Sequence, residues 1–556
     1  MSRTPILVLS LALLGCGTSP SLAPPEDEDC DVAFAVATKV TMEHTSLGEA
    51  RGRCVADDVP RIEQGTLDLT WARVSFQSLS AIDGAGVRRL LLGGSDVDVA
   101  ALQVLAGWSG LEELELWGTN LGDEAMPTLG RLTGLRRLVL WGTHVGDPGL
   151  RSLAGLRGLE VLDLGATLVT DTGVEALQGL PLRELQLWWT GVGDPSAARI
   201  AGLGRLERLG LGGTGLTDAG LAALAPLRGL RELELGSTDV TSAGLRAVSG
   251  MRSLERLGLG GTEVEDLSAL ASLRGLRELD LSSTRVGDEG AGVLGGLPAL
   301  SSLMLGSTKV TDTGATALWR LERLRELDVW GTSIGDAGVA GLARLPQLEE
   351  LQLWYTPITD ASCGALRSAA RLRTLGLGGT AITDDCLGAL AGSASLSDLT
   401  VWATEVGDRG VAALAELPLE ELDLGGTRIT DAALRSLPRD LRSLALWRTR
   451  VTDAGMRHIG GLRGLESLEL WHTAVGDAGV RALGGLDQLR FLALFRTGIT
   501  DDAMGTVGAM TSLTELELGA TAVGSRGVAQ LAGLTRLREL SLGGTRVDDA
   551  ALATLG

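Results

Sequence analysis

Lysine, histidine, cysteine, tyrosine and phenylalanine are all scarce in this chain of 556 residues, and its charge is strongly one-sided. Lysine occurs only as Lys39 and Lys309, and the formal net charge is -21. Because a phosphate backbone demands a basic footprint, this balance excludes nucleic acid as the expected partner. An acidic surface favours basic or neutral partners instead.

The few histidines and cysteines are too scattered to suggest a metal centre, so we expect no metal and no cofactor. Cys30 and Cys54 flank a segment before the repeats and could pair in an oxidising compartment, although sequence alone does not show whether they meet. Cys363 and Cys386 take positions that other repeats give to Leu, Val or Gly. We expect these two to be inert, buried fillers.

The first fifteen residues contain an apolar run, from Ile6 to Leu14, that is too short to span a bilayer as a helix. It has the form of a signal peptide, residues 1–15. The run ends in Leu-Leu-Gly-Cys16, which resembles the lipobox of bacterial lipoproteins, and this resemblance implies a lipid anchor on Cys16. A simple secretory signal is the alternative. Residues 16–29 then have the polar, Pro-rich composition of a tether.

One phrase repeats from residue 90 to the C-terminus: L-x-x-L-x-L-x-x-T-x-[VIL]-[TG]-D-x-G-[LV]-x-x-L-x-x-L. Its marker is a Ser or Thr at twenty positions: Ser95, Thr119, Thr143, Thr167, Thr190, Thr214, Thr238, Thr262, Thr284, Thr308, Thr332, Thr356, Thr380, Thr404, Thr427, Thr449, Thr473, Thr497, Thr521 and Thr545. Most intervals are 24 residues and none is shorter than 22. This period, with Leu at strand spacing, is the signature of leucine-rich repeats, which must stack to bury an apolar face. The sequence therefore predicts an α/β leucine-rich-repeat solenoid of about twenty repeats, a horseshoe with a parallel concave sheet and convex helices.

An aspartate stands just before the expected helix in most repeats, for example Asp123, Asp147 and Asp171. A short side-chain oxygen there accepts hydrogen bonds from free backbone N–H groups, so we expect this Asp to cap the helix that follows. A column of carboxylates could bind calcium instead, but the cap alone accounts for the pattern.

Strand alternation indicates which residues face away from the core. If the first Leu of each strand is slot one, then slots one, four and six are apolar, and slots two, three, five and seven point outward. Slot two alternates Arg and Glu from Arg88 to Arg277, so neighbouring strands never carry like charges there. We interpret slot two as a ladder that fixes the register, because opposite charges on adjacent strands stabilise pairing.

Slots three and five are mainly acidic. The pairs are Glu113 with Glu115, Glu232 with Glu234, Glu278 with Asp280, Glu326 with Asp328, Glu421 with Asp423, and Glu515 with Glu517. The negative electrostatic potential of these acidic pairs favours encounter with cationic peptides or basic protein patches. The strongest ligand-binding candidates among these acids are Glu326, Asp328, Glu421 and Asp423.

Slot seven holds eight of the twelve tryptophans, and every other repeat but one has Gly or Ser there. The column is Trp117, Trp141, Trp188, Trp330, Trp354, Trp402, Trp447 and Trp471, continued by Phe495. Exposed Trp rings can stack on glycans or Arg side chains, or anchor a protein partner, so we take the column as a ligand-binding candidate. The alternative is that the rings lie flat across neighbouring strands where Gly leaves room, and shield the sheet.

Two short matches to catalytic or nucleotide-binding motifs fall inside the repeat register. Residues 331–335 match G-x-S-x-G, and residues 210–215 match G-x-G-x-x-G. Both lack the structural context that gives those motifs their meaning. We therefore expect no enzymatic activity.

The phrase V-T-D-x-G-L-x-x-L resembles the cysteine-containing class of leucine-rich repeats, as in the substrate-binding arrays of F-box proteins, over nearly all of residues 90–556. That class has Cys or Asn where this chain has Thr, and no segment between residues 16 and 86 looks like an F-box. Together with the lipobox, the chain is similar to bacterial leucine-rich-repeat lipoproteins, and this resemblance implies recognition in the cell envelope.

The sequence thus predicts a non-enzymatic, extracytoplasmic, lipid-anchored protein that binds a protein or peptide on an acidic, Trp-lined concave face. It would contact the outer membrane, from the periplasmic or the surface side, through its lipid alone. Two alternatives stay open, a carbohydrate-binding envelope or matrix protein and a structural spacer without a specific ligand. Residues 30–86 are expected to form an N-terminal cap with a degenerate repeat around Leu67, followed by the solenoid of residues 87–556.

Overall fold

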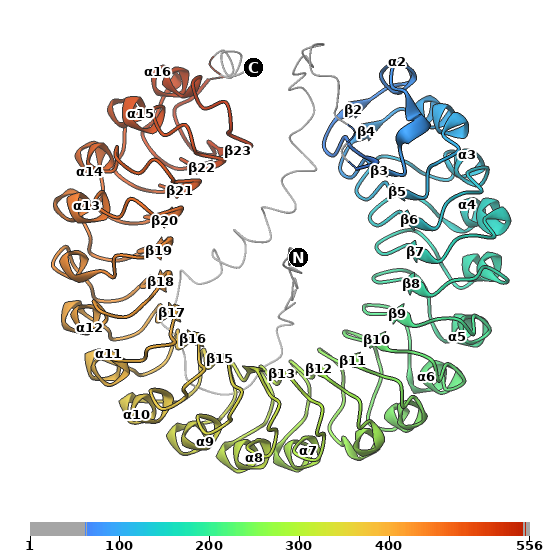
Figure 1. Ribbon diagram of the computed structural model, residues 1–556, viewed down its shortest axis with the longest axis horizontal. Coiled ribbons are helices and arrows are strands. Elements are labelled where there is room, and N and C mark those ends of the chain that lie inside the picture. The colour runs from blue at the N-terminus through green and yellow to red at the C-terminus, as the bar shows by residue number, and fades with distance from the viewer. Residues whose placement is uncertain (1–61, 63, 549–550, 552–556) are drawn as a thin grey trace. The chain divides into compact units, whose positions relative to one another are not determined.

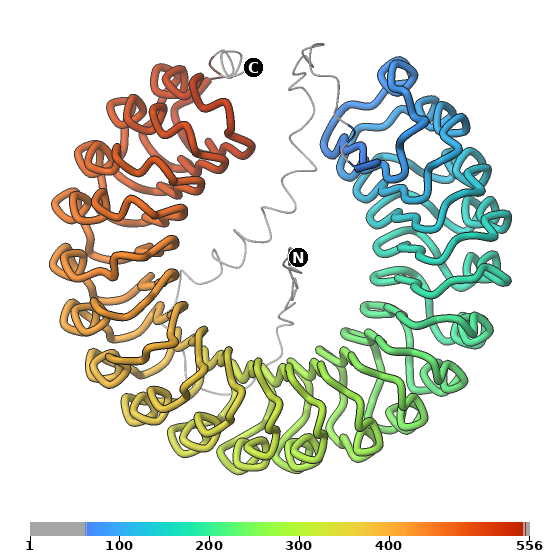
Figure 2. The backbone as a smooth tube through the Cα atoms, in the orientation of Figure 1, coloured from blue at the N-terminus to red at the C-terminus, as the bar shows by residue number. Residues whose placement is uncertain are grey.

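The computed structural model describes residues 62, 64–548 and 551 of the chain. Within the unit Val59–Leu555, each repeat forms a short strand, a tight turn and, in nearly every case, a short helix. The strands line the inner side of the solenoid and the helices its outer side (Figure 1). Successive repeats lie side by side along the backbone trace (Figure 2). The predicted α/β leucine-rich-repeat solenoid is confirmed.

The strands are two or three residues long, and one strand of each repeat lies along the inner side. Their bounds are β1 (Thr66–Asp68), β2 (Arg73–Val74), β3 (Arg89–Leu91), β4 (Asp96–Val97), β5 (Glu113–Glu115), β6 (Arg137–Val139), β7 (Val161–Asp163), β8 (Glu184–Gln186), β9 (Arg208–Gly210), β10 (Glu232–Glu234), β11 (Arg256–Gly258), β12 (Glu278–Asp280), β13 (Ser302–Met304), β14 (Glu326–Asp328), β15 (Glu350–Gln352), β16 (Thr374–Gly376), β17 (Asp398–Thr400), β18 (Glu421–Asp423), β19 (Ser443–Ala445), β20 (Ser467–Glu469), β21 (Phe491–Ala493), β22 (Glu515–Glu517) and β23 (Glu539–Ser541). All except β2 and β4 belong to one parallel sheet of 21 strands. The first is β1, so the degenerate repeat around Leu67 stacks on the solenoid.

The helices are short, and several are 3-10 turns. The α-helices are α2 (Phe76–Ser80), α3 (Met126–Leu129), α4 (Asp147–Leu150), α5 (Asp194–Ala201), α6 (Asp218–Ala223), α7 (Asp288–Leu294), α8 (Asp312–Leu318), α9 (Asp336–Leu342), α10 (Cys363–Leu366), α11 (Asp384–Leu390), α12 (Asp408–Ala413), α13 (Asp453–Ile459), α14 (Asp477–Ala482), α15 (Asp501–Val507) and α16 (Ser525–Val528). The 3-10 helices are η2 (Gly84–Gly86), η3 (Val99–Gly107), η4 (Arg151–Gly155), η5 (Gly173–Leu177), η6 (Gly244–Gly250), η7 (Ser268–Ser272), η8 (Asp360–Ser362), η9 (Ala433–Ser436) and η10 (Ala529–Leu531). None of the described helices has the length and apolarity to span a bilayer.

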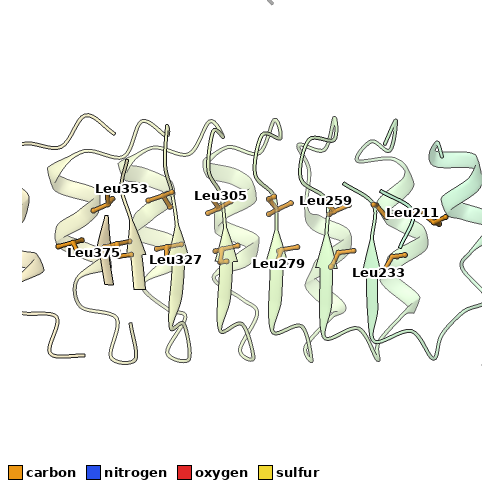
Figure 3. Packing of buried hydrophobic residues seen from close by; sticks show 14 of the residues in the cluster. Leu211, Leu233, Leu259, Leu279, Leu305, Leu327, Leu353 and Leu375 are labelled. Carbon is orange, nitrogen blue, oxygen red and sulfur yellow. The ribbon is translucent and has the colours of Figure 1, made fainter. Parts of the chain in front are cut away.

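The core is a continuous stack of leucines between the sheet and the helices. Figure 3 shows the slot-four residues Leu233, Leu279, Leu327 and Leu375 and the slot-six residues Leu211, Leu259, Leu305 and Leu353 in two parallel rows. Their exposed fractions are between 0% and 2%. Each fully buried Leu contributes about 1.5–3 kcal/mol of hydrophobic free energy, so stacking supplies what a single repeat lacks.

The marker Thr of each repeat closes the turn after the strand. Thr214 Oγ1, for example, donates to the carbonyl oxygen of Leu211 at 2.5 Å, and Thr238 Oγ1 donates to that of Leu235 at 2.6 Å. The residue just before this Thr, which we call slot eight, is left-handed throughout, with φ between 51° and 71°. Glycine adopts that conformation without strain, which explains why it is common in slot eight.

The column of aspartates does cap helices, but the expectation that each Asp caps its own helix is wrong for most of them. Asp266 does so, since its Oδ1 accepts from the Ser268 N–H group at the start of η7, whereas the other described aspartates of the column bond to the next repeat. Asp194 begins α5, and its Oδ1 accepts from the backbone N–H groups of Thr217 and Gly220 in the next repeat at 2.8 and 3.0 Å. Its Oδ2 accepts from Thr217 Oγ1 at 2.6 Å. The first of these bonds, from the backbone N–H group at the next helix start, recurs for Asp123, Asp147, Asp171, Asp218, Asp288, Asp312, Asp336, Asp360, Asp384, Asp408, Asp431, Asp453, Asp477 and Asp501. Each carboxylate therefore joins two repeats.

The expectation that Cys363 and Cys386 are separate, inert fillers is also wrong. They form a disulfide between α10 and α11, with their Cα atoms 5.2 Å apart. Their separation of 23 residues is about one repeat, so stacking brings the two helix starts together. The bond covalently links neighbouring repeats on the outer side.

The slot-two ladder of alternating charges is confirmed. Arg231 Nη1 lies 2.7 Å from Glu255 Oε1, and Arg325 Nη1 lies 2.6 Å from Glu349 Oε1. Because more than half of each arginine side chain is exposed, such pairs contribute little net stability, and their role in fixing the register stays a prediction.

Candidate functional site

Slots three, five and seven form the inner surface of the sheet. On β10, for instance, Leu233 is fully buried, whereas Glu232 and Glu234 on either side of it are partly exposed on the opposite face. The parallel register aligns equivalent slots of successive strands into columns. We call this surface the concave face.

Glu234 lies on the concave face, and neighbouring cations do not fully balance the negative charge of its ionised carboxyl group. Burial raises its pKa to about 8, and the negative charges of Glu232 and Asp280 add to that rise. Arg256 lowers the pKa of Glu234 only in part, because its guanidinium is bonded to Glu232 and lies 3.9 Å from Glu278. A cation brought by a partner would stabilise the ionised carboxylate.

Asp328 and Asp423, both predicted candidates, lie in slot five of β14 and β18. Burial raises the pKa of Asp328 to about 6 and that of Asp423 to about 7. Hydrogen bonds from the backbone N–H groups of Trp330 (3.0 Å) and Gly425 (2.8 Å) oppose those rises. Among the described residues, no cationic side chain contributes to either shift.

The other two acidic candidates, Glu326 and Glu421, lie in slot three of the same strands and are exposed. Burial and the charges of Asp398 and Glu420 raise the pKa of Glu421. The structure thus places all four predicted acids on the concave face, two at its surface and two partly sunk into it.

All eight slot-seven tryptophans and Phe495 lie on the concave face, and Trp141 and Trp188 are the most exposed, at 46% and 38%. The other rings are partly buried against neighbouring strands. A Cβ added to Gly306 would lie 2.0 Å from Trp330 Nε1, and one added to Gly425 would lie 2.0 Å from Trp447 Cε2. The rings therefore occupy space that glycine leaves free, as the packing alternative requires, and their binding role stays a prediction.

Several of these rings contact one another. Trp447 and Trp471 stack in parallel, with centroids 4.7 Å apart and an interplanar angle of 4°. The ring centroids of Trp354 and Trp402 are 6.4 Å apart, and Tyr355 meets Trp402 edge-on at 5.1 Å. Such contacts fix the orientation of the rings before any ligand arrives.

Slot eight carries residues that sequence reasoning missed. Trp189 and Tyr355 stand there with exposed fractions of 48% and 62%, next to Trp188 and Trp354. The signal was present in the sequence, because Leu-Gln-Leu-Trp-Trp-Thr and Leu-Gln-Leu-Trp-Tyr-Thr each add a second aromatic residue to the phrase. The direction of these two side chains depends on the left-handed conformation of slot eight, which only the structure shows.

Slot eight also places cations over the rings near the C-terminal end of the sheet. The guanidinium carbon of Arg448 lies 5.8 Å from the centroid of Trp471, and that of Arg496 lies 5.5 Å from the centroid of Phe495. These distances are within the range of cation–π attraction. The aromatic rings of this solenoid thus already hold cationic side chains in two places.

The predicted lipidation site Cys16 and the possible disulfide pair Cys30 and Cys54 lie outside the described residues. In the part of the chain that the structure describes, no three His, Cys, Asp or Glu side chains gather as metal ligands would.

Comparison with known proteins supports the fold. A family model described as leucine-rich repeat matches residues 274–295. The solved structure of TLR13 in complex with ssRNA13 is 20% identical, covers 86% of this chain and 77% of that chain, and has a TM-score of 0.53. A search of curated protein sequences finds no match.

Two further solved structures have TM-scores below 0.5. An internalin from Listeria monocytogenes is 25% identical over 62% of this chain and 88% of that chain, with a TM-score of 0.42. The Arabidopsis receptor kinase HAESA, in complex with the peptide hormone IDA and the co-receptor SERK1, is 16% identical over 95% and 92%, with a TM-score of 0.43. The repeats of this chain are leucine-rich repeats, and its fold is a leucine-rich-repeat solenoid.

Proposed function

We propose that this protein is a non-enzymatic binding protein that recognises a basic segment of a protein or peptide on its concave face. The observation that carries the proposal is the set of partly buried carboxyl groups of Glu234, Asp328 and Asp423, whose pKa values burial raises to about 8, 6 and 7. Ionising them at neutral pH costs free energy that a cationic ligand would offset. Extended concave surfaces are also what solenoids commonly use for binding, and the HAESA solenoid is described with a peptide hormone.

The test is direct binding of an Arg-rich peptide of about fifteen residues, measured by calorimetry at low and high salt. Attraction to exposed and half-buried charges is screened by ions, so we expect the affinity to fall at least tenfold between about 0.05 and 0.5 M salt. A variant of the face should also bind at least about tenfold more weakly at low salt. It combines Glu234→Gln, Asp328→Asn and Asp423→Asn.

A matched variant removes three carboxyl groups, and at least as much negative charge, from the outer side through Glu175→Gln, Glu289→Gln and Glu416→Gln, all at exposed positions on or beside helices. It should bind like the parent. Equal losses in both variants would mean that net charge, not the concave face, attracts the peptide, and would contradict the proposal.

Carbohydrate binding is the second candidate function, favoured by the exposed fractions of Trp141 (46%) and Trp188 (38%). Neutral oligosaccharides should then bind independently of salt, and Trp141→Gly with Trp188→Gly should abolish that binding. If neither peptides nor sugars bind, the protein is better described as a spacer.

We further propose that the protein is anchored in the cell envelope through lipid on Cys16. The Cys363–Cys386 disulfide supports an oxidising compartment, where such bonds persist. A radiolabelled fatty acid fed to an expressing bacterium should label the protein and should fail to label Cys16→Ser, while Cys30→Ser keeps the label. Label on Cys16→Ser would place the lipid elsewhere, and no label on the parent would exclude the anchor.

A further inference from the structure

Two repeats of the solenoid share an arrangement that the others lack. In one, β8 is followed by Trp188 and Trp189, and in the other β15 is followed by Trp354 and Tyr355. Both strands have Gln in slot five, and in both cases the next repeat reads Leu-Gly-Leu-Gly-Gly-Thr, which puts glycine in slots five, seven and eight. We call these two arrangements the first platform and the second platform.

In the first platform the rings rest on the glycines of the next repeat. A Cβ on Gly210 would lie 2.0 Å from Trp188 Nε1, and a Cβ on Gly213 would lie 2.5 Å from Trp189 Cδ2. Trp188 Nε1 donates a hydrogen bond to Gln186 Oε1, which holds the indole in place. Both side chains keep a sizeable exposed fraction, 38% for Trp188 and 48% for Trp189.

The second platform repeats this geometry. A Cβ on Gly376 would lie 2.2 Å from Trp354 Nε1, and a Cβ on Gly379 would lie 2.6 Å from Tyr355 Cδ1. Gln352 Oε1 and Trp354 Nε1 are both buried there, and neither has a hydrogen-bond partner among the described residues. Trp402, two repeats further on, closes the cluster through its contacts with both rings.

Folding alone does not account for Trp189 and Tyr355. Their φ angles are 55° and 54°, a region that bulky residues rarely adopt, and about half or more of each side chain stays exposed. The glycines beneath the rings do not require large residues in slot eight either. The repeat that contains Gly258, Gly260 and Gly261 has the same Leu-Gly-Leu-Gly-Gly-Thr phrase, and there the side chain of Glu234 covers Gly258.

Each platform has an aspartate in slot five of the preceding strand. Asp163 pairs in register with Gln186, and Asp328 pairs in register with Gln352. Burial raises the pKa of both carboxyl groups. These aspartates lie one strand before each Gln, whereas the rings lie over glycines one strand after it. A cationic side chain that spans these strands would meet a carboxylate and an aromatic ring, so that an ion pair and cation–π attraction act on it together.

Alternate strands between the platforms are acidic, whereas β9 and β11 carry Arg208 and Arg256 in slot three. Slots three and five of β10, β12 and β14 carry Glu232 with Glu234, Glu278 with Asp280, and Glu326 with Asp328. From β8 to β15 there are seven strand steps of about 4.8 Å, or about 34 Å along the sheet. An extended chain of about ten residues covers that distance.

We propose that the two platforms bind two cationic side chains of one basic segment, which lies across the acidic strands between them. This inference rests on the proposed binding function and assigns to it two anchors and their spacing; Asp423, on β18, lies beyond the second platform and would contact a longer ligand. Joining two weak contacts in one ligand raises the effective concentration of the second, so affinity depends on whether the spacer reaches.

The test uses peptides with two arginines at each end and a polyproline spacer, which is semi-rigid at about 3.1 Å per residue. Spacers of about five, ten and seventeen prolines span roughly 16, 31 and 53 Å. By calorimetry the middle peptide should bind at least about tenfold more tightly than the other two. Trp189→Gly or Tyr355→Gly should each remove that advantage, and both place in slot eight a residue that other repeats have there.

The matched control is Ser237→Gly, which makes the same kind of change in slot eight of a repeat between the platforms, where φ is 56°. It should leave the spacer dependence intact. Equal affinity for all three spacers, or equal loss in the control, would overturn the inference. If all three bind equally well the proposed function survives, whereas if none binds and a longer Arg-rich peptide also fails, both fall. Retained peptide binding with loss of a neutral oligosaccharide in Trp189→Gly would assign the platforms to sugars.

Discussion

Replacing Glu234 with Gln should stabilise the protein at pH 9 by up to about 5 kcal/mol and change its stability little at pH 5. Burial and the charges of Glu232 and Asp280 raise the pKa of Glu234 from 4.5 to about 8 in the folded protein. Between these two values the folded chain keeps a proton that the unfolded chain has lost. Stability therefore falls as the pH rises from 4.5 to 8, and above pH 8 the full cost of a buried charge remains.

Urea unfolding at both pH values checks this, with the exposed Glu289→Gln on α7 as the control that should change nothing. A Glu234→Gln variant that is destabilised at pH 9, or equally stabilised at both pH values, would show that the carboxyl group is well compensated in the folded protein.

The cross-repeat caps impose the opposite dependence at lower pH. Burial acts to raise the pKa of Asp194, but the hydrogen bonds from Thr217 and Gly220 outweigh it and leave the pKa below 3.8. Asp288 and Asp336 are shifted in the same direction by equivalent bonds. A carboxyl group with a lowered folded-state pKa stabilises above its unfolded value and loses that contribution as the pH falls through the folded value. The protein should thus be most stable in mildly acidic solution.

The sequence was sufficient for the fold because Leu and Thr repeat with one period and each repeat folds by local rules. The sequence did not show with which repeat a polar side chain forms its hydrogen bonds. Asp194 follows its own strand in sequence, yet it bonds to Thr217, because stacking brings the next helix start closer to the carboxylate than its own N–H groups. The Cys363–Cys386 separation of 23 residues, about one repeat, carries the same information.

The candidate site could be predicted as a set of columns but not as a surface. Slot seven was correctly placed on the concave face, whereas the orientation of each ring depends on glycines in the adjacent repeat, such as Gly306 beneath Trp330. Trp189 and Tyr355 escaped notice because strand alternation gives no direction for a side chain on a left-handed residue. The charge state of Asp423 likewise depends on burial, which no pattern of letters reports.

The affinity for an Arg-rich peptide should rise at least about tenfold between pH 5.5 and 8.5. At pH 5.5 Asp328, Asp423 and Glu234 are largely protonated, since burial raises their pKa values to about 6, 7 and 8. Arginine keeps its charge throughout, so only the protein titrates. A bound guanidinium favours the ionised carboxylate, lowers its pKa and releases a proton.

Calorimetry in two buffers with different ionisation enthalpies measures that proton release directly. The parent should release protons on binding near pH 7, and the variant with Glu234→Gln, Asp328→Asn and Asp423→Asn should release few and show a flat pH profile. Proton release distinguishes the partly buried acids Glu234, Asp328 and Asp423 from the exposed slot-three acids. Glu326 and Glu421 are open to solvent, and their charges are screened by salt. Peptide binding without proton uptake or release would assign recognition to the exposed carboxylates. The partly buried carboxyl groups would then only destabilise the fold and would have no role in binding.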